Sequence, residues 1–255
     1  MTHNNMSATH RFFVPPGSIV ENRVFFPDFM KNQLERVLRM NRGDKITVLD
    51  GAGYRYIVSI ETVGKNIESG LILHTYYGDS EPSLKVTLYQ ALIKHDNFEY
   101  VLQKGVELGI SEFVPFTSSR TEFAIPSDSR FNRWRKIIRE AAEQCGRDKL
   151  PEITSPLTIQ QSLMESDPLS FIPWEEEKNC GLRDFLNKDK NVLYMQGGKA
   201  SIFIGPVGGF TFTEIQFAQD QGVTPVSLGK RILRSETAGL VATTALLYEA
   251  GEMDV

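Results

Sequence analysis

The sequence has few cysteines and histidines and no long apolar run. Two of its 255 residues are cysteine and four are histidine, too few and too widely spaced for a disulfide framework or a zinc site. No apolar run reaches the roughly 18 residues of a membrane-spanning helix. Residues 1–10 are polar and lack the apolar centre of a secretory signal. These features favour a protein of the reducing cytoplasm that binds no metal and no membrane.

The motifs of several common enzyme classes are also missing. The glycine-rich loop at 205–209 is not followed by Gly-Lys-Ser or Gly-Lys-Thr, which argues against a phosphate-binding loop and a nucleotide hydrolase. No Gly-x-Gly-x-x-Gly fingerprint opens a strand-loop-helix unit. The sequence contains no Gly-x-Ser-x-Gly motif, so no histidine is assigned to a catalytic triad. The four histidines are His3, His10, His74 and His95.

Charge is low overall but unevenly distributed. The net charge is −4 and the isoelectric point is about 5.7, so the chain does not bind nucleic acid through bulk charge. Lys31–Lys45 nevertheless carries five basic against two acidic residues, and Arg130–Lys149 carries seven against three. Such patches fit either a protein that recognises one shaped RNA site or ordinary solvated helix faces.

Residues 1–78 have the pattern of a small β-rich domain. Alternating apolar residues predict a strand at Leu71–Tyr77, and a hairpin with a glycine-containing turn is expected over Val48–Val58. One helix is expected over Asp28–Met40. Its spacing places four apolar residues on one face, Met30, Leu34, Val37 and Leu38, and leaves Lys31, Arg36 and Arg39 free.

Residues 79–255 alternate strands with helices, which predicts an α/β domain with a mostly parallel sheet. A capping box of Asp96 and Glu99 is expected to open one helix, and Thr213 is expected to cap another. The predicted strands are Leu84–Leu92, Phe113–Phe116, Leu169–Pro173, Ser201–Ile204 and Val226–Leu228. The predicted helices are Asp96–Leu108, Phe131–Cys145, Thr213–Gly222 and Glu236–Tyr248.

The most informative stretch is 203–237. An apolar run enters the loop Gly205-Pro206-Val207-Gly208-Gly209, whose glycines can adopt positive φ and let a ligand approach the backbone. Further along, Leu228–Thr237 combines a glycine turn, two arginines and the start of a helix. Two backbone-rich loops at strand ends predict a nucleotide-like pocket in an open α/β sheet.

This stretch resembles the ribosomal RNA small subunit methyltransferase E family of the SPOUT superfamily. The family pattern Leu-Gly-x-x-Ile-Leu-Arg-x-Glu-Thr-Ala is matched by Leu228–Ala238. The family's Gly-Pro-Glu-Gly-Gly loop is also present, but Val207 replaces its glutamate. Further matching blocks follow in the same order along most of the chain: Arg11–Val14, Leu34–Asp44, Lys94–Gly109, Pro115, Arg120 and Arg133–Arg147.

The resemblance implies both a fold and an activity. It implies a PUA-like RNA-binding β-barrel over residues 1–78 and a SPOUT-type methyltransferase domain over 79–255, with a trefoil knot at about 201–240. The activity it implies is S-adenosylmethionine-dependent methylation of N3 of a uridine in 16S rRNA. The implied partners are 16S rRNA or the assembled small ribosomal subunit, and a second copy of the chain. The helix Glu236–Tyr248 is apolar enough to form that homodimer contact, and burial in the core of its own chain is the alternative.

The two loops and the resemblance together define a set of candidate cofactor-binding residues: Pro173, Ile204, Gly205, Gly208, Gly209, Leu228, Gly229, Ile232, Leu233 and Thr237. Uridine N3 must lose its proton before it accepts a methyl group, so a base or a cation beside the uracil is required. Arg234, Glu236 and Arg11 are the catalytic candidates. An arginine can stabilise the uracil anion but cannot accept the proton. An ion pair of Arg234 with Glu236 or Glu140 is the alternative.

Six arginines are candidate RNA-binding residues: Arg11, Arg36, Arg39, Arg120, Arg133 and Arg147. The acidic turn Glu175–Glu177 is interpreted as a solvated surface. Val207 leaves a second function open, since valine can neither accept a proton nor pair with a cation. If the family's glutamate is required for catalysis, the chain is instead an RNA-binding protein of the same fold with weak or no catalysis.

Overall fold

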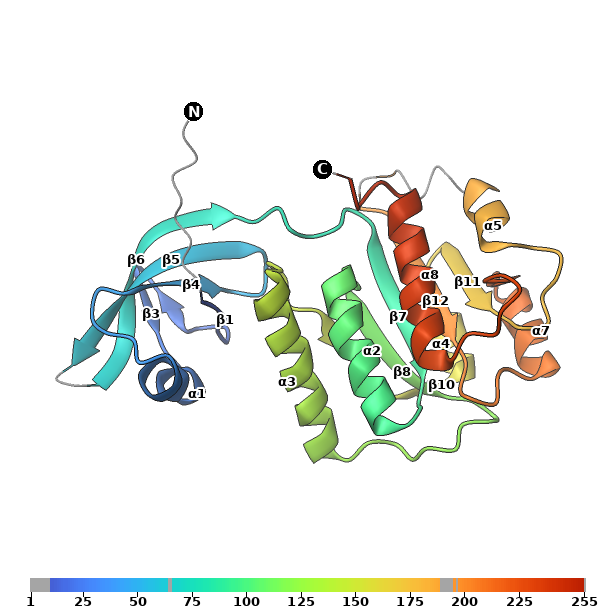
Figure 1. The fold of residues 1–255 in the computed structure, drawn as a ribbon, viewed down its shortest axis with the longest axis horizontal. Helices are drawn as coiled ribbons and strands as arrows, with labels where there is room; N and C mark the ends of the chain where they lie inside the picture. The colour runs from blue at the N-terminus through green and yellow to red at the C-terminus, as the bar shows by residue number, and fades with distance from the viewer. Residues whose placement is uncertain (1–9, 64–65, 189–194, 196, 255) are drawn as a thin grey trace. The chain divides into compact units, whose positions relative to one another are not determined.

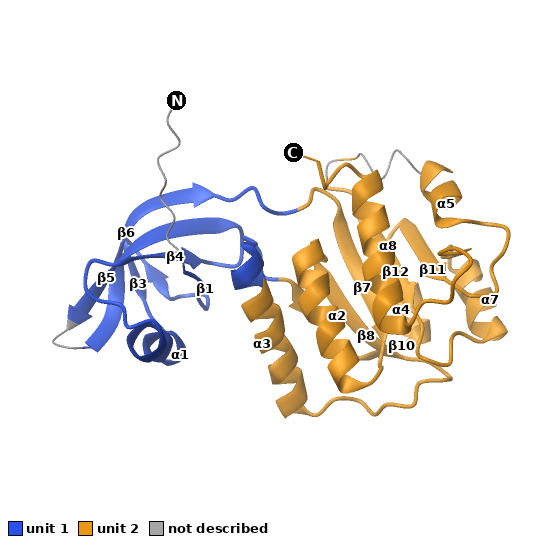
Figure 2. Cartoon of the chain, viewed as in Figure 1, with its two compact units in different colours: residues 1–81, 142–150 blue, residues 82–141, 151–255 orange. Residues whose placement is uncertain are grey.

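The computed structural model describes residues 10–63, 66–188, 195 and 197–254, and therefore not His3. The chain divides into two compact units (Figure 2). The first comprises Met1–Glu81 with Ala142–Leu150, and the second comprises Pro82–Ala141 with Pro151–Val255. Sequence reasoning placed one boundary after residue 78 and had no indication that a segment near residue 145 returns to the first unit.

The first unit contains a curled six-stranded sheet in the order β1-β4-β5-β6-β3-β2 (Figure 1). Only the β1–β4 pair is parallel, and two register shifts interrupt the long β5–β6 hairpin, where such irregularities bend a sheet. Among the described residues no pairing joins β1 to β2, so closure into a barrel stays a prediction. The strands are β1 Arg11–Phe13, β2 Ile19–Val20, β3 Arg23–Phe25, β4 Lys45–Leu49, β5 Tyr54–Val63 and β6 Asn66–Tyr77.

The helical segment of this unit covers the core of the sheet. It begins as α1 (Asp28–Asn32) and continues as a π-helical turn, η1 (Gln33–Val37). Met30 and Leu34 are fully buried, as predicted, but the prediction for Val37 was wrong, because this side chain is 71% exposed. Hydrogen bonds five residues apart, such as Leu38 N–H to the Gln33 carbonyl, change the angular spacing and turn Val37 outward.

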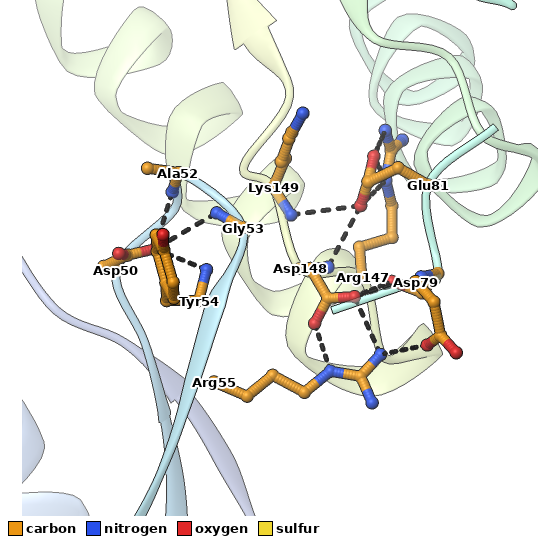
Figure 3. Close-up of polar contacts among 11 residues, drawn as sticks. Asp50, Ala52, Gly53, Tyr54, Arg55, Asp79, Glu81, Arg147, Asp148 and Lys149 are labelled. Carbon is orange, nitrogen blue, oxygen red and sulfur yellow. Dashed lines mark hydrogen bonds and ion pairs between the residues drawn. The ribbon is translucent and has the colours of Figure 1, made fainter. Parts of the chain in front are cut away.

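Buried charges hold the segment that returns to the first unit (Figure 3). Arg147 is 5% exposed and its Nη2 lies 2.6 Å from Oε2 of Glu81. The other Glu81 oxygen accepts the backbone N–H groups of Asp148 and Lys149, both at 3.0 Å. The predicted RNA contact is therefore corrected for Arg147, since its charge is neutralised inside the unit.

Asp148 forms the second half of this network (Figure 3). Its side chain is 1% exposed and accepts hydrogen bonds from the Arg55 guanidinium, with Nη2 at 2.7 Å, and from the Ser80 N–H at 3.1 Å. Burial would raise the pKa of Asp148, but the hydrogen bonds from Arg55 and Ser80 outweigh it and lower this pKa below its usual value. Asp148 is therefore ionised at neutral pH.

The second unit is built on a parallel sheet in the order β10-β8-β7-β12-β11-β13, with β9 beside β8. The predicted α/β alternation is confirmed. The strands are β7 Lys85–Ala91, β8 Glu112–Thr117, β9 Glu152–Ile153, β10 Leu157–Thr158, β11 Leu169–Pro173, β12 Lys199–Ile204 and β13 Thr224–Val226. The helices are α2 His95–Leu108, α3 Asp128–Cys145, α4 Ile159–Met164, α5 Leu182–Lys188, α7 Phe212–Asp220 and α8 Ser235–Glu249.

Helices cover both faces of this sheet. Alternate β7 residues point to opposite faces: Leu88 and Gln90 lie under α8, whereas Tyr89 joins the apolar cluster beneath α4 and α7. On the first face α8 packs against α2, as Figure 1 shows. Both faces of the sheet are therefore shielded from water, so a polar ligand can reach the sheet only at the strand ends.

Two predicted helix starts need correction. No side chain caps α2 among the described residues, and the carboxylate of Glu99 accepts two hydrogen bonds from Arg133 instead of forming a capping box. Helix α7 is capped by Thr211, not Thr213, through a reciprocal box with Glu214. At α2, Glu99 pairs with Arg133, which is distant in the sequence. At α7, the capping residue lies two positions before the predicted one.

Candidate functional site

The two loops selected from the sequence lie at the carboxyl ends of neighbouring strands. Strand β11 pairs in parallel with both β12 and β13. Pro173 ends β11, Gly205 follows β12, and Leu228 follows β13 by two residues. Parallel strands carry their carboxyl ends to one edge of the sheet, which is where ligands bind in open α/β sheets.

A cavity of about 490 Å³ opens at this edge, and a second of about 130 Å³ shares part of its wall. Both are bordered by Pro173, Glu175, Ile232, Leu233 and Ala238. Of the predicted cofactor-binding residues, Gly208 and Thr237 border neither cavity. The others border one or both: Pro173, Ile204, Gly205, Gly209, Leu228, Gly229, Ile232 and Leu233.

The glycine loop has a turn that requires glycine at one position. Gly209 has a φ of 68°, and its N–H donates to the Pro206 carbonyl at 3.0 Å. A Cβ on Gly209 would also clash with the Glu175 carboxylate. The turn is therefore held by its own hydrogen bond, and a side chain at position 209 would fill the space beside the backbone.

A second turn, Ser118–Thr121, braces the glycine loop from outside. Nη1 of Arg120 donates to the Gly208 carbonyl at 2.8 Å and to the Phe210 carbonyl at 3.4 Å. The Ser119 N–H donates to Oε1 of Glu214 at 2.8 Å. Sequence reasoning assigned Arg120 to RNA; in the structure its guanidinium also holds the backbone of the predicted cofactor loop.

Glu214 joins this brace to α7. Its side chain is 5% exposed, and its Oε2 accepts the Thr211 N–H at 2.8 Å. Burial would raise the pKa of Glu214, but the hydrogen bonds from Ser119 and Thr211 outweigh it and lower this pKa. The carboxylate therefore stabilises the fold above its usual pKa, and this contribution is lost as pH falls through the lowered folded-state value.

Glu214→Gln is expected to destabilise the protein by about 1–3 kcal/mol at pH 7. The two carboxylate oxygens accept the Ser119 and Thr211 N–H groups, whereas the amide has one oxygen and directs its own N–H groups at the other donor. The loss should shrink as the pH falls below the folded-state pKa of Glu214, where the parent carboxyl is also neutral. Urea unfolding at several pH values measures both effects. The exposed Glu122→Gln is the matched control. A loss that is independent of pH would contradict the assignment of an ionised Glu214.

The two catalytic candidates on this unit, Arg234 and Glu236, both border the larger cavity. Among the described residues neither takes part in an ion pair, and the Glu140 carboxylate lies 3.6 Å from Lys136. The alternative ion pair of Arg234 is therefore wrong, and its charge remains available to a bound group. Arg11 belongs to the first unit, where its guanidinium lies against Gly146.

Comparison with known proteins agrees with this geometry. Residues 80–247 match the model of an RNA methyltransferase domain. Over 240 residues the chain is 35% identical to Ribosomal RNA small subunit methyltransferase E of Synechocystis sp., covering 91% of this chain and 75% of the relative. The chain belongs to the ribosomal RNA small subunit methyltransferase E family.

Two further members of the family cover nearly the whole chain. The Bacillus subtilis protein of the same name is 31% identical over 223 residues, which is 86% of this chain and 87% of the relative. The crystal structure of the Neisseria gonorrhoeae enzyme bound to S-adenosylmethionine is 32% identical with a TM-score of 0.82. That match covers 94% of this chain and 97% of the Neisseria chain.

Some residues that border the larger cavity were not predicted as site residues, among them Glu175, Asn97 and Ser235. Glu175 was interpreted as part of a solvated turn. Its position two residues after Pro173, at the carboxyl end of β11, indicates the same sheet edge and was the available clue. Asn97 is in the first turn of α2, for which the sequence offered no clue.

The predicted RNA-binding arginines differ in how free they are. Arg36 and Arg39 are exposed in the first unit. Arg133 is 65% exposed but forms two hydrogen bonds with Glu99, at 2.7 and 2.8 Å. Within the described ranges, no group of three or more His, Cys, Asp or Glu residues could hold a metal, and no helix is long and apolar enough to cross a bilayer.

Proposed function

We propose that this chain methylates N3 of a uridine in 16S rRNA of the small ribosomal subunit, in the cytoplasm, with S-adenosylmethionine as methyl donor. One observation carries the proposal: both motifs of the family meet around one cavity at the carboxyl edge of the parallel sheet. Its volume of about 490 Å³ is within the range of small-molecule sites. The Neisseria gonorrhoeae relative, whose structure contains S-adenosylmethionine, supports the choice of cofactor.

The finer features of the fold belong to the same proposal. A trefoil knot over about residues 201–240 is supported by the chain's membership of the family, to which the resemblance assigned that knot. A PUA-like RNA-binding barrel over residues 1–78 is supported by the curled sheet of the first unit. We assign residues 79–255 to the SPOUT-type domain, although residues 79–81 and Ala142–Leu150 belong to the first compact unit.

The residues at the cavity fit the chemistry of methyl transfer. S-adenosylmethionine, when bound, supplies an activated methyl group. The loop Gly205–Gly209 and the segment Leu228–Leu233 would hold S-adenosylmethionine largely through backbone groups. The absence of a side chain at Gly209 leaves room for a ligand beside the backbone. In-line transfer requires the acceptor within about 3–3.5 Å, so the two loops mainly provide position.

The acceptor needs electrostatic help, which Arg234 and the start of α8 would give. Loss of the N3 proton leaves a negative charge on the uracil. The Arg234 guanidinium, which has no ion-pair partner within the described ranges, and the N-terminus of α8 would both stabilise that charge. Glu236, in the first turn of α8, is the candidate acceptor of the proton at this edge.

Val207 decides between catalysis and the alternative of an RNA-binding protein with weak activity. Its side chain is 74% exposed, and the loop is shaped by the Gly209–Pro206 and Arg120–Gly208 hydrogen bonds instead. The loop is therefore held by hydrogen bonds that do not involve the side chain at position 207, which favours catalysis. Val207→Glu with little effect on turnover supports this view. A large gain in turnover would favour the alternative.

Cofactor identity is tested by thermal shift and calorimetry on the parent chain. We expect S-adenosylmethionine and S-adenosylhomocysteine to raise the melting temperature, and ATP to leave it unchanged. Stabilisation by ATP alone would instead favour a nucleotide hydrolase that uses the glycine loop.

We expect a homodimer that uses the exposed face of α8. Val241 is 41% and Tyr248 is 69% exposed on this helix, and Tyr100 of the neighbouring α2 is 49% exposed. Apolar side chains gathered on one surface favour burial against a second copy. Light scattering should give twice the 28.8 kDa chain mass, and Tyr248→Asp should shift the protein toward monomer. A parent monomer at micromolar concentration would contradict the dimer.

We expect RNA to be contacted by Arg11, Arg36 and Arg39 of the first unit and by Arg120 and Arg133 of the second. Arg36→Ala and Arg39→Ala should each weaken binding to small subunits and lower the salt slope by about one, without changing cofactor affinity. Filter binding across a salt series measures both quantities, with the exposed Arg183→Ala of α5 as control. Parent-like binding by both variants would remove the first unit from the RNA interface.

A further inference from the structure

A buried hydrogen-bond chain crosses three elements beneath the cavity. Gln90, on the central strand β7, is 1% exposed, and its Nε2 donates to Oγ of Ser235 at 2.9 Å. Oγ of Ser235 in turn donates to the Gly205 carbonyl at 2.6 Å. The chain therefore links the sheet centre, the first residue of α8 and the first residue of the glycine loop.

The direction of each hydrogen bond in this chain is fixed by its neighbours. Nε2 of Gln90 also lies 3.2 Å from the Ala91 carbonyl, which can only accept, so the amide nitrogen and not the oxygen faces Ser235. The Gly205 carbonyl likewise only accepts, so it receives the single hydroxyl hydrogen of Ser235. Reversing the Gln90 amide would place oxygen against oxygen, and the arrangement therefore has one orientation.

The buried side chain of Gln90 lowers the stability of the folded protein. Oε1 of Gln90 is buried and has no hydrogen-bond partner among the described residues; its neighbour is Gly239, where a Cβ would lie 3.4 Å away. A buried amide with an unpaired oxygen costs stability that leucine would not. Nε2 of Gln90 makes two hydrogen bonds, to the adjacent Ala91 carbonyl and to Ser235, and only the one to Ser235 reaches another element.

We infer that Gln90 and Ser235 are positioning residues that fix the glycine loop against the start of α8 before the cofactor arrives. This inference rests on the proposed function, since Gly205 and Ser235 both border the cavity assigned to the cofactor. Holding two binding segments in place lowers the ordering cost of binding. We assign neither residue a role in proton transfer; both act through the backbone of Gly205, whose carbonyl accepts the hydroxyl hydrogen of Ser235.

Hydrogen exchange in the absence of ligand tests the positioning directly. The Gly209 N–H, bonded to the Pro206 carbonyl, reports on the loop. We expect Ser235→Ala to lower its protection at least tenfold and Ser235→Thr to retain it. Ser162→Ala is the control for loss of a hydroxyl, because Ser162 of α4 is buried and its hydroxyl has no partner among the described residues. Parent-like protection in Ser235→Ala would overturn the inference.

Calorimetry with S-adenosylmethionine tests whether the two residues act as one unit. Ser235→Ala and Gln90→Leu should each raise the Kd about tenfold, and the double variant should be no weaker than the weaker single variant. Additive losses, or an unchanged Kd in both single variants, would overturn the inference. If the parent fails to bind S-adenosylmethionine, the proposed function fails, and the exchange experiment alone decides on the positioning role.

Discussion

Gly209→Val is expected to raise the Kd for S-adenosylmethionine at least about 100-fold, because a β-branched residue cannot adopt a φ of 68° without strain. The new side chain would also clash with the Glu175 carboxylate inside the cavity. The loop must therefore open, and the hydrogen bond from Gly209 to Pro206 is lost with it. Calorimetry on folded protein measures the effect.

Gly222→Val separates this effect from general backbone strain. Gly222 follows α7, has a φ of 84°, and has open space around the position of a Cβ. Both substitutions strain the backbone, so both should lower the melting temperature. Only the Gly209 variant should lose the cofactor. Parent-like affinity in a folded Gly209→Val protein would contradict the assignment of this loop.

Asp148→Asn is expected to destabilise the first unit by about 3 kcal/mol, because one partner of a buried ion pair is removed. The Arg55 guanidinium and the Ser80 N–H lose a charged acceptor that is 1% exposed. Since the pKa of Asp148 is lowered in the folded state, the parent's advantage is present at neutral pH and is lost as pH falls through that value. Urea unfolding of the whole chain at several pH values measures the difference.

Asp79→Asn provides a control within the same network. Asp79 also pairs with Arg55, at 3.4 Å, but its side chain is 96% exposed. An exposed pair of this kind is worth about 0–1 kcal/mol. Equal losses for the Asp79 and Asp148 variants would contradict the view that burial makes Asp148 important.

The two loops that border the cavities could be predicted because their requirements are local. A strand end, a positive-φ glycine and a helix start are each visible within a few residues, and the structure brings Gly205 and Leu233 to one cavity. The parallel sheet followed from the alternation of strands and helices for the same reason. Local patterns carry this information because backbone conformation is decided mainly by near neighbours.

The remaining features depend on partners that are distant in the sequence. Arg147 looked like a free cation until the fold placed it beside Glu81. Gln90 is one polar residue in an apolar strand, and only the position of Ser235 shows what it holds. Val37 had the correct helical spacing, but one π-helical turn moved it outward. None of these outcomes follows from residue type or period alone.

The central claim is most directly tested by mass mapping of 3-methyluridine in 16S rRNA. Small subunits from cells that lack this gene would be incubated with S-adenosylmethionine and either the parent protein or Gly209→Val. We predict one new 3-methyluridine with the parent and none with the variant. Parent protein that binds S-adenosylmethionine and small subunits but leaves every uridine unmodified would contradict the account.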